Sequence, residues 1–188
     1  MARLIYGAVT SLDGYIEDPE GKLDFTTPDD EVHRFINDSE RSLGTHLYGR
    51  RMYETMKGWE DTYGGPDDPP AMQEYAVVWR GLDKVVYSTT LTPQEIITPR
   101  TRLERTFEAT ALRRMKERAE RDIGIGGAAL AAHAFRAGLV DDIWLFVCPI
   151  VVGGGKRALP EDVQLPLRLV DERRFANGFV YLRYSVTT

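Results

Sequence analysis

The segment from Arg121 to Pro149 restricts the possible folds more than any other part of the chain. Ile123 to Ile125 is a short apolar run, typical of the end of a buried strand, and the Gly126-Gly127 pair interrupts it. Strong helix formers fill Ala128 to Ala137, and Ile143 to Cys148 is a second apolar strand. The order strand, glycine turn, helix, strand predicts one unit of an α/β sheet.

The glycine turn in this unit has two interpretations. A helix N-terminus presents unpaired N–H groups, and glycines without side chains let a phosphate approach them. Glycines also serve a tight turn that only packs a helix on a sheet. Gly124, Gly126 and Ala129 match G-x-G-x-x-A, a dinucleotide fingerprint that normally lies in the first βαβ unit. Because this match comes two-thirds of the way along, we expect a phosphate-binding turn but not a standard Rossmann fold.

Length and charge exclude several classes of protein. The chain has 188 residues, enough for a single domain over 1–188 with a sizeable core. Its net charge of −5 argues against a general nucleic-acid binder. It has no long apolar span and no signal peptide, which predicts a cytoplasmic protein without a membrane partner. Cys148 is the only cysteine, so an internal disulfide is excluded.

Strands and helices alternate through the rest of the chain. This alternation predicts an α/β fold with a mixed, mostly parallel sheet and an antiparallel C-terminal hairpin. Met72 to Trp79 fits either a helix or a strand, and the charges near Lys116 indicate a solvated helix face. Gly44 is expected to end the first long helix. The other expected strands are Leu4–Thr10, His46–Tyr48, Lys84–Tyr87, Thr98–Leu103, Leu165–Val170 and Gly178–Val186, and the other expected helices are Thr27–Ser42 and Phe107–Arg121.

Five pieces of the chain, in this order, resemble one family. They are A-V-T-S-L-D-G-Y-I at Ala8–Ile16, L-Y-G-R-R-M-Y-E at Leu47–Glu54, V-V-Y-S-T-T at Val85–Thr90, I-G-I-G-G-A-A-L at Ile123–Leu130 and G-L-V-D-D-I-W-L-F-V-C-P-I-V-V-G-G-G-K at Gly138–Lys156. The chain is similar to the dihydrofolate-reductase-like superfamily. The most similar branch is that of the C-terminal reductase domain of the bifunctional riboflavin-biosynthesis deaminase-reductase. The resemblance covers nearly the whole chain and implies a three-layer αβα fold.

The resemblance implies an NADPH site. In the family, the Gly-Arg turn after the second strand binds the cofactor phosphates, and guanidinium groups beside a helix start suit that task. Ordinary surface charge is the alternative for Arg50 and Arg51. The glycine pair binds pyrophosphate and carries a cis peptide bond in the family. The expected cofactor-binding residues are Ala8, Val9 and Ile16 at the nicotinamide, Gly49, Arg50, Arg51 and Met52 at the phosphates, Ser88, Thr89 and Thr90 at the adenosine half, and Ile125, Gly126, Gly127, Ala128, Ala129 and Leu130 around the glycine pair.

The resemblance also implies a substrate side with catalytic candidates. Dihydrofolate reductases use an acid of the first long helix to hold and protonate the pterin, and Glu31, with Val32 and Phe35, is its best match. The alternative is that Glu31 is one of three acids stabilising the helix N-terminus. Asp13 either caps the S-L-D-G turn or faces the site. Lys156 matches a cation for a ribityl-phosphate tail, and the glycines before it form either an anion-binding loop or a flexible bulge.

Together these features predict an NADPH-dependent reductase of a small nitrogen heterocycle, most like 5-amino-6-(5-phosphoribosylamino)uracil reductase of riboflavin biosynthesis. No zinc deaminase half is present, because the chain lacks an H-x-E with a C-x-x-C pair, and no metal site is expected. The alternatives are dihydrofolate reductase proper and a non-catalytic NADP-binding module. The apolar strand Phe179–Val186 and Trp144 favour a homodimer. The sequence does not identify the physiological substrate.

Overall fold

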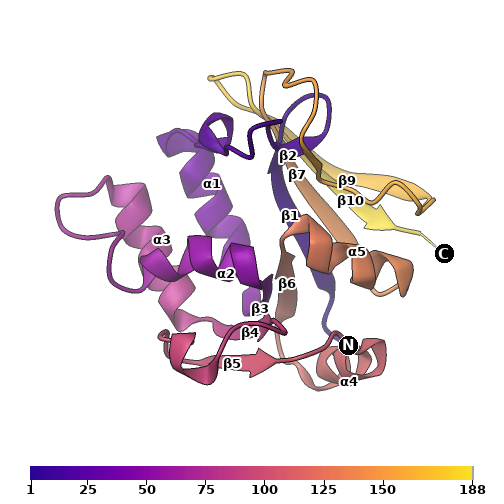
Figure 1. Cartoon of the computed structure of the whole chain (residues 1–188). Coiled ribbons are helices and arrows are strands. Elements are labelled where there is room, and N and C mark those ends of the chain that lie inside the picture. Colours follow the sequence, from indigo (N-terminus) through magenta and orange to yellow (C-terminus); the bar gives the residue numbers. More distant parts are fainter. Residues whose placement is uncertain (188) are drawn as a thin grey trace.

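The computed structural model describes residues 1–187. An eight-stranded sheet in the order β5-β4-β3-β6-β1-β7-β10-β9 forms the body, with β2 and β8 in a small second sheet (Figure 1). The strands are β1 (Leu4–Thr10), β2 (Tyr15–Glu17), β3 (Leu43–Gly49), β4 (Asp83–Tyr87), β5 (Thr101–Glu104), β6 (Asp122–Gly126), β7 (Asp142–Val147), β8 (Lys156–Arg157), β9 (Leu167–Arg174) and β10 (Val180–Val186). The α-helices are α1 (Asp30–Glu40), α2 (Arg50–Met56), α3 (Pro70–Gly81), α4 (Ala109–Arg118) and α5 (Ala128–Arg136), and the short 3₁₀ helices are η1 (Asp24–Thr26), η2 (Lys57–Trp59) and η3 (Pro93–Glu95).

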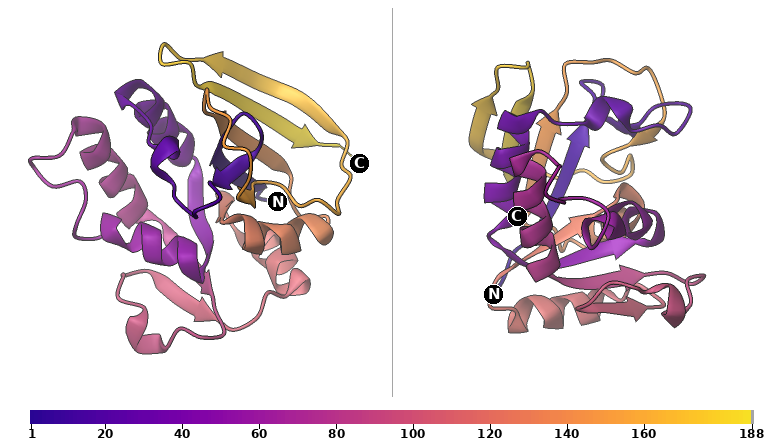
Figure 2. Two further views of the ribbon diagram at one scale, coloured as in Figure 1. Left: turned by 45° about the horizontal axis from the view of Figure 1, so that its top comes forward. Right: turned by 90° about the vertical axis from the view of Figure 1, so that its left-hand side faces the viewer.

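The strand directions confirm the predicted mixed sheet. Strands β5, β4, β3, β6, β1 and β7 are parallel, whereas β10 runs antiparallel to both β7 and β9. The hairpin β9–β10, yellow in Figure 2, forms one edge of the sheet and β5 forms the other. Strands β3, β6 and β1 are neighbours although they are distant in sequence, so their carboxyl ends meet at one place. In open α/β sheets such a place is where ligands bind.

Helices cover both faces of this sheet, as the resemblance implied (Figure 1). Successive side chains of a strand lie on opposite faces, and β1 follows this rule. Leu4 and Tyr6 pack into a core cluster with Leu130 of α5, whereas Ile5 packs into another with Val32 of α1. The three-layer αβα arrangement therefore follows from the apolar residues on both faces of the central strands.

Several boundaries differ from the sequence prediction. Helix α1 begins at Asp30 because the Asp29 carboxylate accepts the N–H of Val32 at 3.0 Å and caps the helix in place of Thr27. Strand β3 begins at Leu43, so Gly44 lies inside a strand and does not end the helix. Pairing with both β4 and β6 extends this strand beyond its most apolar residues. The undecided segment from Met72 to Trp79 lies within helix α3.

Lys116 is the exception on the charged helix α4. Its side chain is buried; Nζ donates to the carbonyl of Leu139 at 2.9 Å and lies 2.6 Å from the Asp141 carboxylate. Predicting a solvated lysine here was wrong, because Lys116 shares the packed side of the helix with Leu112. The charge is tolerated there because both a carbonyl and a carboxylate receive it.

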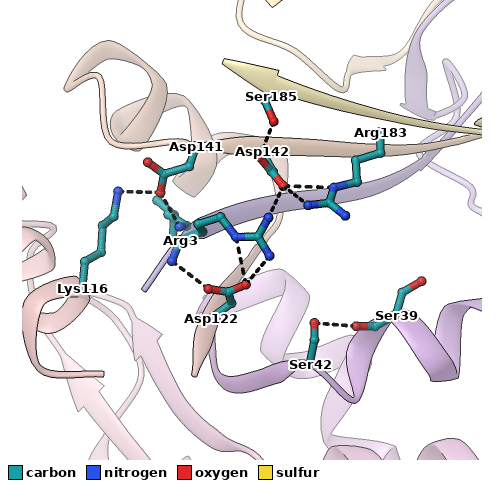
Figure 3. Close-up of polar contacts among 10 residues, drawn as sticks. Arg3, Ser39, Ser42, Lys116, Asp122, Asp141, Asp142, Arg183 and Ser185 are labelled. Carbon is teal, nitrogen blue, oxygen red and sulfur yellow. Dashed lines mark hydrogen bonds and ion pairs between the residues drawn. The ribbon is translucent and has the colours of Figure 1, made fainter. Parts of the chain in front are cut away.

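A partly buried ionic network joins the amino-terminal ends of β1, β6 and β7 to β10 (Figure 3). Arg3 lies 2.6 Å from Asp122 and 2.9 Å from Asp142, measured between Nη and Oδ2 atoms. Arg183 Nη2 lies 2.8 Å from the same oxygen of Asp142, and the Ser185 hydroxyl donates to the other oxygen at 3.0 Å. Asp142 is only 2% exposed, so these donors replace the water that its carboxylate has lost.

Candidate functional site

A cleft of about 670 Å³ opens at the carboxyl ends of β1 and β3, which is an ordinary volume for a small-molecule site. Its walls come from β1, β2 and β8, from the segment around η1, from the length of α2 and from the first turn of α5. The predicted site residues that line it are Ala8, Val9, Ile16, Gly49, Arg50, Arg51, Met52, Gly127, Ala128, Ala129, Leu130 and Lys156. Five separate segments of the chain therefore meet here, as expected from their positions after parallel strands.

Two helices begin at the cleft, each directly after a glycine. Helix α5 follows Gly127 and α2 follows Gly49. Neither helix has a capping side chain that accepts a hydrogen bond from the N–H groups of its first turn. The N–H groups of these first turns therefore remain available to a ligand. Gly127 has a φ of +89°, which L residues rarely adopt, and a Cβ there would lie 3.5 Å from Met52 Cβ. This backbone geometry suits an anionic group held close to the main chain.

Arginine side chains flank this backbone cradle. Arg50 donates to Glu54 at 2.8 Å and to the hydroxyl of Thr90 at 2.9 Å, and the hydrogen bond to Glu54 raises the pKa of Arg50. The Arg51 side chain is 69% exposed. Ion pairs that are this exposed are weak, so a ligand phosphate can take either guanidinium from its present partner.

Glu17 is an acid in the cleft wall that was not predicted from the sequence. Its side chain is only 14% exposed, with one oxygen accepting from Arg51 Nη2 at 3.3 Å and the other 3.9 Å from Lys156 Nζ. The pairing of β2 with β8 places Glu17 opposite Lys156. No local pattern reveals this pairing, because the two strands are far apart in the chain.

Several other residues that line the cleft were not predicted from the sequence. Thr55 and Met56 lie three or four residues after Met52 on α2, so helical spacing was a signal that could have found them. Leu23 and Thr26 come from the segment around η1, where the sequence has no regular period. The lining residues without a prediction are Tyr6, Gly7, Glu17, Leu23, Thr26, Glu54, Thr55 and Met56.

Glu31, predicted as the catalytic acid, does not line the cleft. Its carboxylate pairs with Arg173 of β9 at 3.0 Å and accepts the N–H of Ala176 at 3.3 Å. The guanidinium of Arg173 in turn lies over the ring of Phe35. Glu31 therefore attaches α1 to the C-terminal hairpin, and the prediction is corrected on this ground.

Asp13, the second catalytic candidate, fastens a loop. Its carboxylate accepts the N–H of Val152 at 3.1 Å and of Gly153 at 2.8 Å. The Ser11 hydroxyl and these N–H groups lower the pKa of Asp13. Of the two alternatives from the sequence, capping a turn is the one that these contacts fit. They also hold the glycine run against the S-L-D-G turn.

The predicted substrate contacts Val32 and Phe35 belong to the core. Val32 is fully buried, and the Phe35 ring centroid lies 4.8 Å from that of Tyr181 and 5.4 Å from that of Phe175. Val32 therefore has no surface left for a ligand, whereas Phe35 is half-buried and packs its ring against this core. Of the three predicted substrate-binding residues, the structure brings only Lys156 to the cleft.

Ser88, Thr89 and Thr90 lie outside the cleft lining. The Ser88 hydroxyl is buried and accepts the N–H groups of Thr90 at 3.2 Å and Leu91 at 3.0 Å, so it orders the turn after β4. Thr90 contacts the site only by accepting a hydrogen bond from Arg50. Thr89 is exposed and borders no described cavity.

The peptide bond between Gly126 and Gly127 is trans, and residues 1–187 contain no cis bond. The cis bond implied by the resemblance is thus absent from this structure. The positive φ of Gly127 turns the chain from β6 into α5 instead. Ile125 and Gly126 end β6 and line a second cavity, not the cleft.

This second cavity, which we call the chamber, has a volume of about 180 Å³ and adjoins the cleft. Gly7, Ala8, Val9, Met52 and Met56 line both spaces, so they form the boundary between them. A Cβ on Gly7 would meet no atom within 4 Å, so there is open space beside Gly7. The remaining chamber lining is mainly aromatic and aliphatic, and it comprises Ile5, Ile36, Ser39, Glu40, Leu43, His46, Tyr48, Tyr75, Gly124, Ile125, Gly126, Trp144 and Phe146.

No group of three or more His, Cys, Asp or Glu side chains in residues 1–187 is arranged to hold a metal ion. None of the helices in the described chain has the length and apolar character needed to cross a membrane.

Comparison with known proteins agrees with the architecture. The chain is 28% identical over 187 residues to the uncharacterized protein YyaP of Bacillus subtilis, covering 97% of this chain and 94% of that protein. A putative riboflavin biosynthesis protein from Shewanella superposes with a TM-score of 0.77 at 20% identity, over 100% of both chains. Enterococcus faecalis dihydrofolate reductase, solved in complex with NADP(H), gives 0.65 at 14% identity over 99% of this chain and 97% of that one.

A bifunctional protein also matches in structure. The diaminohydroxyphosphoribosylaminopyrimidine deaminase/5-amino-6-(5-phosphoribosylamino)uracil reductase of Thermotoga maritima gives a TM-score of 0.67 at 13% identity. The match covers 99% of this chain but only 57% of that protein. The profile of the RibD C-terminal domain matches residues 2–181. The chain therefore belongs to the RibD C-terminal domain family, with a dihydrofolate-reductase-like fold.

Proposed function

We propose that the protein is an NADPH-dependent reductase of a small nitrogen heterocycle, most like 5-amino-6-(5-phosphoribosylamino)uracil reductase. Membership of a reductase family supports an oxidoreductase. The observation that carries the cofactor assignment is the cradle at Gly127, where the uncapped start of α5 faces the cleft beside Arg50 and Arg51. Main-chain N–H groups and two guanidinium groups are the chemistry that a pyrophosphate and a 2′-phosphate require.

The residues present fit this cofactor. Gly49, Gly127 and the arginines would hold the phosphates, while Ala8, Val9 and Ile16 would lie against the nicotinamide. When bound, NADPH supplies the hydride, and the protein contributes orientation and exclusion of water. Glu17 follows Ile16 on β2 and lies 3.9 Å from Lys156 in the cleft wall, so these two side chains are the candidates to hold polar groups of the substrate.

A panel of substrates tests this proposal. NADPH oxidation is followed at 340 nm with aminopyrimidinones carrying a phosphoribosylamino group, with dihydrofolate and with quinones. Turnover of the aminopyrimidinone is the expected result. The second candidate is dihydrofolate reductase proper, and the structural similarity to the Enterococcus faecalis enzyme supports it. Turnover of dihydrofolate alone would establish this candidate. NADPH binding with no turnover in any assay would favour a non-catalytic NADP-binding module.

We further propose that two copies associate in the cytoplasm through the C-terminal hairpin. The residues expected at the interface do not form a free edge, because Trp144 is buried and β10 pairs with both β7 and β9. The edge strand is β9, in which every residue is exposed, including Leu167, Leu169 and Val170. Such edges are commonly covered by another chain. Light scattering after size exclusion should give twice the 21.3 kDa chain mass, and a monomer would contradict the proposal. Cell fractionation tests the location.

A further inference from the structure

A groove of about 500 Å³ lies beside α4, and none of its lining residues borders the cleft or the chamber. Thr45 of β3 lines this α4 groove, whereas the next residue, His46, lines the chamber. Because successive side chains of a strand point to opposite faces, the groove and the chamber lie on opposite faces of the sheet. The α4 groove is therefore a separate space, and its volume is within the range of small-molecule sites.

The position of α4 on the sheet creates this groove. Leu112 of α4 belongs to the core cluster that contains Leu47 of β3 and Ile123 of β6, so the helix covers these two strands. The sheet continues past β3 to β4 and β5, and Figure 1 shows β5 and α4 together at the lower end of the molecule. Tyr87 on β4 and Arg102 on β5 therefore form the floor of the groove, and α4 forms its wall.

Positive charge is concentrated around the α4 groove. The segment 100–121 contains eight lysine and arginine residues and four glutamates, although the whole chain has a net charge of −5. Three of these cations, Arg102, Arg114 and Arg118, line the groove. Arg102 lies 3.2 Å from the carboxylate of Glu104, but both side chains are about half exposed, so this ion pair is weak. An anionic ligand can therefore compete for Arg102.

Arg114 and Arg118 differ from the other cations of α4. Arg113 donates to a backbone carbonyl at 3.5 Å, and Lys116 pairs with Asp141. Within residues 1–187, no hydrogen bond or ion pair involves the guanidinium group of Arg114 or Arg118. The two residues are one turn apart, and like charges at this spacing destabilise a helix. A bound anion would offset this repulsion, and a guanidinium group can bind a phosphate through two parallel hydrogen bonds.

The opposite end of the α4 groove is acidic. Helix α4 connects the parallel strands β5 and β6, so it runs antiparallel to them and ends with Arg118 near their amino-terminal ends. Glu104, which ends β5, and Glu108, which directly precedes α4, line the other end of the groove. Burial raises the pKa of Tyr87, so this phenol stays protonated and can donate a hydrogen bond between the two ends. Carboxylates accept hydrogen bonds from hydroxyl groups, whereas guanidinium groups only donate.

We propose that the α4 groove binds a phosphorylated sugar. The phosphate accepts hydrogen bonds from Arg102, Arg114 and Arg118. The sugar hydroxyl groups donate to Glu104 and Glu108. A sugar phosphate carries an anion at one end and hydroxyl donors at the other, which is the pattern that the charges of the groove require. This site goes beyond the proposed reductase function, because the groove shares no residue with the cleft.

Calorimetric titration of the full chain with ribose 5-phosphate, without NADPH, tests the cationic end. The double variant Arg114→Gln and Arg118→Gln should weaken binding at least about tenfold, because charge-assisted hydrogen bonds to phosphate are lost. Arg113→Gln is the matched control, since it removes a neighbouring cation that does not line the groove, and it should bind like wild type. Equal affinity in the double variant and wild type, or no binding to wild type, would overturn the proposal. Weaker binding in Lys156→Gln with an unchanged double variant would place the ligand in the cleft, and would also overturn it.

A comparison with inorganic phosphate tests the acidic end. Wild type should bind ribose 5-phosphate more tightly than phosphate, and Glu108→Gln should reduce this preference about threefold or more. Equal affinity for the two probes in wild type would indicate an adventitious ion only and would contradict a sugar site. An unchanged preference in Glu108→Gln would contradict the assigned hydroxyl contact. All these titrations are read without NADPH, so a failure of the proposed cofactor binding would leave their outcome unaffected.

Discussion

The charged side chains at the two ends of the central sheet differ in how completely they are paired. At the amino-terminal end, Asp142 receives Arg3, Arg183 and Ser185, and its carboxylate has no capacity left for a ligand (Figure 3). At the carboxyl end, the side chains of Arg50 and Arg51 are 48% and 69% exposed and lie beside uncapped helix starts. The paired charges at the amino-terminal end hold the strands together, whereas the cations and N–H groups at the carboxyl end are available to a ligand. Variants at the two ends should therefore separate stability from ligand affinity.

Asp142→Ala should give the largest effect. It leaves two guanidinium groups without their shared carboxylate in a mostly buried position, a change that costs about 3 kcal/mol of unfolding free energy. Urea denaturation of wild type and variant measures the difference. Asp162→Asn removes an exposed partner of Arg136 and serves as control, with a midpoint like wild type. Equal stability of Asp142→Ala and wild type would contradict the structural role of the network.

Substitution of both Arg50 and Arg51 by alanine should affect binding and leave folding intact. Both guanidinium groups are about half exposed or more, so the melting temperature should stay near that of wild type. NADPH affinity should fall at least about tenfold, because charge-assisted bonds to phosphate are lost. Titration with both NADPH and NADH measures the change. Unchanged affinity for both dinucleotides would remove these arginines from the site.

Glu17→Gln should strengthen NADPH binding, in contrast to the arginine substitutions. The Glu17 carboxylate pairs with Arg51 and lies 3.9 Å from Lys156 Nζ, so it competes with an anionic ligand for these two cations. Its neutral amide should strengthen NADPH binding about two- to fivefold, the size expected for a partly exposed pair. Glu31→Gln is the matched control, since Glu31 pairs with Arg173 away from the cleft. The same affinity in wild type and Glu17→Gln would show that this carboxylate does not compete.

The smallest effect concerns pH. Burial tends to raise the pKa of Asp122, but the hydrogen bonds and charge of Arg3, with the charge of Arg183, outweigh it and lower the pKa below its usual value. A group with a lowered folded pKa stabilises the protein above its unfolded pKa near 4, and this contribution is lost as the pH falls through the folded value. Urea denaturation from pH 6 to 3 should show a flatter acid limb for Asp122→Asn. Identical limbs would contradict this assignment.

Patterns along the chain predicted most of the fold. The apolar runs of β1, β4, β6 and β7 and the glycine turn before α5 were sufficient for the sheet, whereas most of the predicted cleft residues came from the family resemblance. The period of two in β10 predicted the hairpin. Lys116 and Gly44 were misplaced because a charge or a glycine in the sequence does not reveal a tertiary partner or a paired strand.

The substrate side was less predictable, because its chemistry comes from distant pairs. Glu31 had the right residue type on the right helix, yet its partner Arg173 lies on the hairpin. Glu17 becomes a cleft residue only when β2 pairs with β8. Side-chain partners that different elements bring together are not encoded in any local period.

The central claim is that the carboxyl end of the sheet grips one dinucleotide through main-chain N–H groups and two arginines. Calorimetric titration of the folded wild-type protein with NADPH tests this claim most directly. The account predicts saturable binding of one NADPH per chain, accompanied by a higher melting temperature at millimolar ligand. A folded protein that shows neither heat of binding nor thermal stabilisation at that concentration would contradict the claim.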